Sequence, residues 1–124
     1  SNEWHVQHLT DPRSVGPESV MPRYGFLKDK ILSIPNIAAH LKANVDVGVP
    51  YTADDIANAK SDLMAQADPN ADTADLLKRY PKAKVGDFDG NPQEVTEMDA
   101  LIAYLQMLGT LVDFTKYDEV AGYR

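Results

Sequence analysis

The sequence predicts a single, mainly α-helical domain over residues 1–124, with helices joined by long loops that contain proline and glycine. Apolar residues recur at helical spacing, most clearly in the segment 96–109. Thr-x-x-Asp capping boxes stand before two such segments. The chain contains eight prolines and seven glycines, which separate the helical segments. At 124 residues and 44% hydrophobic content, the chain can bury one modest core.

The composition excludes several classes of partner and chemistry. The net charge of -7 leaves no excess of Lys and Arg to neutralise phosphates, so nucleic acid is not an expected partner. This charge is compatible with an acidic face toward a basic protein partner. No run of about 18 apolar residues is present to span a membrane. The absence of cysteine excludes disulfides and thiolate metal sites. Because the chain opens with Ser-Asn and not with Met, we expect a piece of a longer protein.

Residues 3–9 are expected to form a short helix that ends before the Asp-Pro pair at Asp11. His5 and His8 are three residues apart, which is a spacing that can place two metal ligands on one helix face. No third ligand accompanies them. We therefore expect surface or hydrogen-bonded histidines here, and not a metal site.

The stretch 11–26 (D-P-R-S-V-G-P-E-S-V-M-P-R-Y-G-F) contains three prolines and two glycines. We expect a loop without a regular helix or a central strand. It carries many apolar residues for a loop, so an apolar surface should lie beside it. Met21 has two interpretations: a side chain that fills a gap in the core, or a thioether ligand. The apolar residues are Val15, Val20, Met21, Tyr24 and Phe26.

Two helices are expected next, over 36–47 and over 52–67, and they can fold as a hairpin. Thr52 and Asp55 form the capping box of the second helix. Gly48-Val49-Pro50-Tyr51 breaks the pattern between them. The apolar faces consist of Ile37, Leu41 and Val45 in the first helix and Ile56, Ala59, Leu63, Met64 and Ala67 in the second.

A polar insertion follows, over about 68–93. The first three ligand positions of a calcium loop match Asp68, Asn70 and Asp72. However, Thr73 stands in the place of the loop's glycine, and Arg79 stands in the place of its bidentate glutamate. We therefore expect no EF-hand. A short helix over 73–80 and a turn in the later D-F-D-G segment are the expected structures.

The segment 96–109 is the longest helical pattern in the chain. Thr96 and Asp99 form its capping box, and Gly109 is its candidate end. Its apolar stripe offers more surface than one neighbouring helix would cover. The stripe consists of Met98, Leu101, Ile102, Leu105, Leu108 and Val112.

Four segments of the chain resemble, in order, the mono-haem c-type cytochrome subunit of cbb(3)-type cytochrome c oxidases, the FixO/CcoO family. They are W-H-V-Q-H-L-T-D-P-R-S-V, P-E-S-V-M-P-R-Y, G-V-P-Y-T-A-D-D-I and E-M-D-A-L-I-A-Y-L-Q-M-L-G-T. The resemblance covers nearly the whole chain. It implies the C-terminal part of a class I cytochrome c-like domain, because the family's C-x-x-C-H motif and its membrane anchor precede the matched region.

The resemblance implies a function in electron transfer on the periplasmic side of the bacterial inner membrane. Such a subunit relays electrons through haem c to the oxygen-reducing catalytic subunit and is not catalytic alone. Its partners would be the catalytic and di-haem cytochrome subunits and a donor cytochrome. The full-length protein would carry haem c, but we expect none bound to this chain, which lacks cysteine. The alternative is a haem-free binding or assembly module that docks onto other subunits of a membrane complex.

By the same resemblance, Met21 matches the axial methionine that binds haem iron opposite the missing histidine. Arg13 is a candidate partner for a haem propionate. The remaining walls of the haem crevice would be Pro12, Val15, Pro22, Tyr24 and Phe26. In the implied fold, the helix at 96–109 packs across an N-terminal helix that this chain lacks. We therefore expect Leu101, Ile102, Leu105 and Leu108 to be short of cover, and the chain to form a homodimer.

Overall fold

The computed structural model describes residues 1–110 and is mainly helical over this range, as the sequence predicts. Its β-structure there is limited to one isolated bridge between Ile31 and Thr96. None of the helices in this range is long and apolar enough to cross a membrane. The elements are α1 (Asn2–Thr10), α2 (Pro12–Val15), η1 (Gly25–Asp29), η2 (Ile34–Asn36), α3 (Ile37–Asp46), α4 (Ala53–Ala67), α5 (Ala74–Arg79) and α6 (Glu97–Leu108), where η marks a 3-10 helix.

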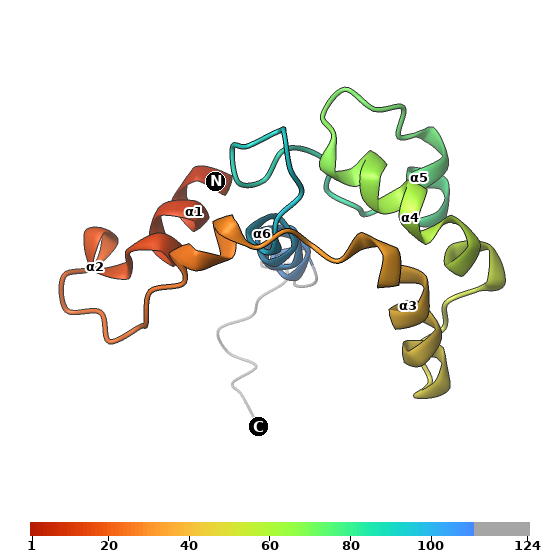
Figure 1. The fold of residues 1–124 in the computed structure, drawn as a ribbon, viewed down its shortest axis with the longest axis horizontal. Helices are drawn as coiled ribbons and strands as arrows, with labels where there is room; N and C mark the ends of the chain where they lie inside the picture. Colours follow the sequence, from red (N-terminus) through yellow and green to blue (C-terminus); the bar gives the residue numbers. More distant parts are fainter. Residues whose placement is uncertain (111–124) are drawn as a thin grey trace, which may run out of the picture.

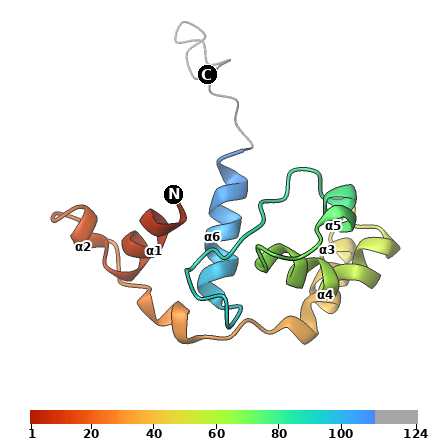
Figure 2. The ribbon, with the colours of Figure 1, turned by 90° about the horizontal axis from the view of Figure 1, so that it is seen from above.

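Helix α6 stands at the centre, with α1 and α2 on one side and α3, α4 and α5 on the other (Figures 1 and 2). The predicted capping box is confirmed: the Asp99 N–H donates to Thr96 Oγ1 at 3.2 Å, and the Thr96 N–H donates to Asp99 Oδ2 at 2.9 Å. Gly109 is the C-cap, as expected. Val112, the last residue of the predicted stripe, lies outside the described residues.

The core forms where α1, η1 and the loop before α6 meet α6. Ile102 and Met98 are fully buried there, and Leu101 and Leu105 pack against them. The expectation that these stripe residues lack cover is therefore wrong, except for Leu108, which is 40% exposed. The core cluster consists of Leu9, Phe88, Met98 and Ile102, with Val6, Met21, Tyr24, Leu27, Leu101, Ala103 and Leu105 packed against it.

The predicted loop over 11–26 is wrong at both of its ends. Pro12–Val15 form one helical turn, because proline at the first helical position loses no hydrogen bond and its fixed φ suits a helix. The Gly16 N–H then donates to Pro12 O at 2.9 Å. Gly25 and Phe26 begin η1. Residues 16–24 are non-helical, as predicted.

Helices α3 and α4 pack against each other, and α5 packs against α4. Helix α3 ends in a Schellman motif, in which Gly48 has φ +98° and the Val49 and Gly48 N–H groups donate to Asn44 O and Val45 O, each at 2.9 Å. The second capping box is confirmed at the start of α4. Helix α5 confirms the short helix predicted within the insertion.

Candidate functional site

Met21 lies in the non-helical segment between α2 and η1. Its N–H donates to Ser19 Oγ at 3.2 Å, and its partly buried side chain packs against the core cluster. The Tyr24 N–H donates to Leu9 O at 2.8 Å, which ties this segment to the end of α1. The segment therefore holds a thioether sulfur at the edge of an apolar core.

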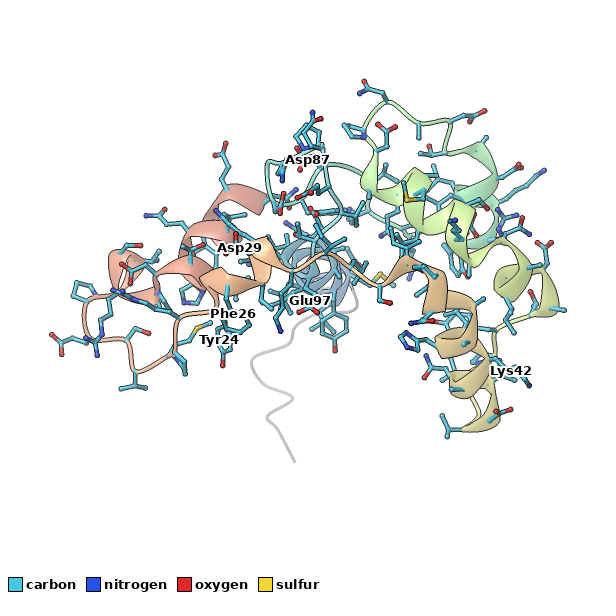
Figure 3. The ribbon with its side chains drawn as sticks, in the orientation of Figure 1. Tyr24, Phe26, Asp29, Lys42, Asp87 and Glu97 are labelled. Carbon is cyan, nitrogen blue, oxygen red and sulfur yellow. The ribbon has the colours of Figure 1, made fainter. Side chains whose placement is uncertain are left out.

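Two aromatic side chains follow Met21. The ring centroids of Tyr24 and Phe26 are 6.2 Å apart; Tyr24 directly precedes η1, and Phe26 lies in its first turn (Figure 3). Tyr24 packs against the core cluster, whereas Phe26 is 50% exposed with Lys30 Nζ 5.3 Å from its ring centroid. Phe26 therefore presents an exposed ring next to Tyr24, which packs against the same core as Met21.

The other residues proposed from the resemblance lie in different environments. Arg13 is exposed, and its Nε donates to Ser19 O at 3.4 Å. None of the ion pairs formed within residues 1–110 includes Arg13, so its guanidinium is available to an anion. Pro22 and Val15 are exposed, while Pro12 is fully buried within the chain. The structure thus brings Met21 and Tyr24 to one core and leaves Arg13 at the surface.

The donor set fits one side of a haem site. A thioether is the soft ligand that iron accepts from methionine, and it stands here at the edge of an apolar core. Tyr24 packs against the same core cluster as Met21, the Phe26 ring lies 6.2 Å from that of Tyr24, and Arg13 is an exposed cation. The cysteines for covalent attachment are not in this chain.

The two histidines of α1 both contact Trp4. The Trp4 and His8 rings are tilted by 33° with centroids 4.7 Å apart, and the Trp4 ring meets His5 edge-on at 5.3 Å. Burial, the N-terminal ammonium group and His8 together lower the pKa of His5. These contacts give both histidines a packing role beside Trp4.

Three carboxylates, those of Asp87, Asp89 and Asp99, have oxygen atoms within 4.8 Å of one another. Asp99 is only 5% exposed and accepts hydrogen bonds from the N–H groups of Phe88 at 3.1 Å and Asp89 at 2.9 Å. Burial, followed by the charge of Asp89, raises the pKa of Asp99. Thr96 Oγ1 donates to Asp89 Oδ2 at 2.7 Å. These bonds attach the loop before α6 to its first turn.

A cleft of about 610 Å³ opens on the other side of α6. Ala103 and Met107 of α6 contribute to one wall, and Ile37, Leu41 and Leu63 of α3 and α4 contribute to the opposite one. A second hollow of about 450 Å³ shares several of these residues and reaches Ala100 and Tyr104. The open face of α6 was predicted to be the stripe that includes Ile102, but the face beside this cleft is the open one.

A comparison with protein families matches residues 1–112 to the family described as "Cytochrome C oxidase, mono-heme subunit/FixO". No curated protein matches the chain. The matched region includes α1, the Met21 segment and α6, and it spans far more than half of the sequence. The chain therefore belongs to the FixO family of mono-haem cytochrome c oxidase subunits.

Proposed function

We propose that this chain is the C-terminal part of a c-type cytochrome domain that relays electrons through haem c to the oxygen-reducing subunit of a cbb(3)-type oxidase. One observation supports this most: Met21 presents a thioether at the edge of an apolar core in a chain of the mono-haem family. The domain would work on the periplasmic side of the bacterial inner membrane. Its partners would be the catalytic and di-haem subunits and a donor cytochrome.

Each residue of the site has a defined part in this proposal. Haem c would supply one-electron transfer between ferrous and ferric iron. Met21 would provide the axial sulfur, which favours the ferrous state and raises the potential. Tyr24 and Phe26 would exclude water from the iron ligand and lower the local dielectric. Arg13 would pair with a propionate through its planar guanidinium.

The cleft beside α6 supports the proposal that this chain is only a part of the cytochrome domain. Ala100 and Ala103 have small side chains, which allow another helix to approach α6 closely. We propose that the upstream part of the longer protein, which carries the C-x-x-C-H motif, packs on this face. Without that part, we expect two copies of the chain to pair through the exposed residues of α6.

The second candidate function is a haem-free module that docks onto other subunits of the oxidase. The observation that favours it is the core itself, because Met21 packs against Leu9, Phe88, Met98 and Ile102 as an ordinary apolar side chain does. In this alternative, Met21 has a packing role and binds no iron.

Substitution of Met21 separates the two functions. In the full-length, haem-loaded subunit, Met21→Ala should abolish the sulfur-to-iron absorption band and lower the midpoint potential. Met64→Ala is the matched control, because Met64 is 45% exposed on α4, across α6 from Met21. An unchanged spectrum in Met21→Ala would rule out axial ligation by this residue and would favour the haem-free module.

A further inference from the structure

The described part of the chain contains two units that are packed separately. The core unit consists of residues 1–32 and 87–110, and the outer unit consists of residues 34–86 with α3, α4 and α5. Every member of the core cluster belongs to the core unit. The outer unit has buried residues of its own, such as Asp62 and Leu76, and its helices pack against one another and against η2. Each unit therefore holds its own helices in place.

Few interactions cross between the two units within residues 1–110. Each ion pair in this range joins residues of the same unit. The hydrogen bonds also stay within one unit, except that the Ile34 N–H donates to Leu32 O at 2.9 Å. That bond spans Ser33 alone, whose φ of -77° and ψ of 73° are the angles of an inverse γ-turn. Between α6 and the outer unit lies the cleft of about 610 Å³.

The chain passes between the units at two short links, one on each side of the outer unit (Figure 2). The first link is Ser33. The second is the Gly86–Asp87 peptide, because the Gly86 N–H donates to a carbonyl oxygen of α4 at 2.9 Å and the Phe88 N–H donates to Asp99 Oδ1 at 3.1 Å. Gly86 has φ +150°, a conformation that residues with a side chain rarely adopt. Rotation of the backbone at these two links is therefore enough to move the outer unit as one body.

We propose that the outer unit is hinged at its two links and swings to close the cleft against α6. In the closed position, Leu41 and Leu63 would cover Ala103 and Met107, which line the opposite wall. Burial of these apolar side chains favours closure, and the open position exposes this face of α6. The Met21 side chain packs within the core unit, so the movement leaves its surroundings intact. The inference is therefore independent of haem ligation.

Distances between spin labels test the movement directly. Because the chain has no cysteine, labels can be attached at chosen pairs of introduced cysteines. The pair Gln7→Cys and Lys60→Cys, at exposed positions of α1 and α4, spans the two units. Pulsed electron double resonance should give a broad or two-peaked distance distribution for this pair. The control pair within the outer unit, Lys42→Cys and Lys78→Cys, should give one narrow peak. An excess of unlabelled chain removes distances between copies.

An equally narrow peak for the pair that spans the units would overturn the proposal. Substitution of Gly86 then tests the position of the second hinge. Gly86→Ala should shift the distance between positions 7 and 60, because alanine disfavours the positive φ. Gly48→Ala is the matched control: Gly48 also has a positive φ, of +98°, and an added Cβ would meet no atom within 4 Å at either glycine. An unchanged distance in Gly86→Ala, or an equal shift in Gly48→Ala, would contradict a hinge at the Gly86–Asp87 link.

Discussion

Arg79 and Asp62 form a bidentate ion pair that joins α5 to α4. Arg79 Nε donates to Asp62 Oδ2 at 2.7 Å, and a second guanidinium nitrogen donates to Asp62 Oδ1. Asp62 is 6% exposed, whereas Asp54, the second carboxylate near Arg79, is largely exposed at 3.5 Å. The buried carboxylate is therefore the partner that fixes the position of α5.

Removal of the Asp62 carboxylate should destabilise the chain strongly. Asp62→Ala leaves the guanidinium without its close partner, so the urea midpoint should fall much further than in Asp54→Ala. The double variant Asp62→Leu/Arg79→Leu should regain most of the loss, because no uncompensated charge remains near the cleft. Equal midpoints for Asp62→Ala and Asp54→Ala would contradict this assignment.

The two capping boxes should differ in their contributions to stability. Thr52 is exposed, so Thr52→Val should cost about 1 kcal/mol, the usual value for an N-cap. Thr96 is fully buried and also bonds to Asp89, so Thr96→Val should cost about 2 kcal/mol, at the upper end of the range for caps. Urea denaturation of both variants measures the difference. A larger loss for Thr52→Val would show that the bonds around Asp99 contribute little.

The capping boxes also show which contacts can be predicted from the sequence. Thr52 with Asp55 and Thr96 with Asp99 were predictable, because a capping box is complete within four residues. The bonds from Phe88 and Asp89 to Asp99 cross a loop, and no local pattern encodes them. The Arg79–Asp62 pair was missed for the same reason. Arg79 served only to exclude a calcium loop, and its partner lies 17 residues upstream.

Two further differences between the predicted and the observed structure have physical causes. The turn Pro12–Val15 was missed because proline usually breaks a helix, although it suits the first position. The stripe on α6 was predicted correctly as apolar, but periodicity does not show which neighbour covers it. In the structure α1 lies against α6, and Gln106 Nε2 donates to Asn2 Oδ1 at 2.7 Å. Axial ligation by Met21 stays a prediction.

Stability should fall in alkaline solution as the unfolded chain loses a proton that the folded chain keeps. Burial, with the charges of Asp55 and Asp62, raises the pKa of Tyr80 to about 12 from its ordinary value of 10.0. Tyr80 therefore contributes stability that is fully present below about pH 10 and is lost as the pH rises to about 12. Tyr80→Phe should flatten the dependence of the urea midpoint on pH in this window. If Tyr80→Phe and the wild type show the same dependence of the urea midpoint on pH, Tyr80 is not the group responsible.

The exposed face of α6 predicts self-association of this chain. Tyr104, Met107 and Leu108 are 59%, 37% and 40% exposed, and their spacing places them on neighbouring positions of one helix surface. Complete burial of one such side chain is worth roughly 1.5 to 3 kcal/mol. Pairing of two copies about a two-fold axis would bury three side chains from each copy. We therefore expect a dimer in sedimentation velocity, with a dissociation that depends on concentration.

Leu108 is the residue that tests this dimer. Leu105 is unsuitable, because it packs against the core cluster and an acidic residue there would disturb the monomer. Leu108→Asp should give a monomer with an unchanged circular dichroism spectrum, since Leu108 is 40% exposed at the last turn of α6. Leu77→Asp, at a similarly exposed position on α5, should remain dimeric. If the unmodified chain sediments as a monomer at every concentration, α6 is not a self-association surface.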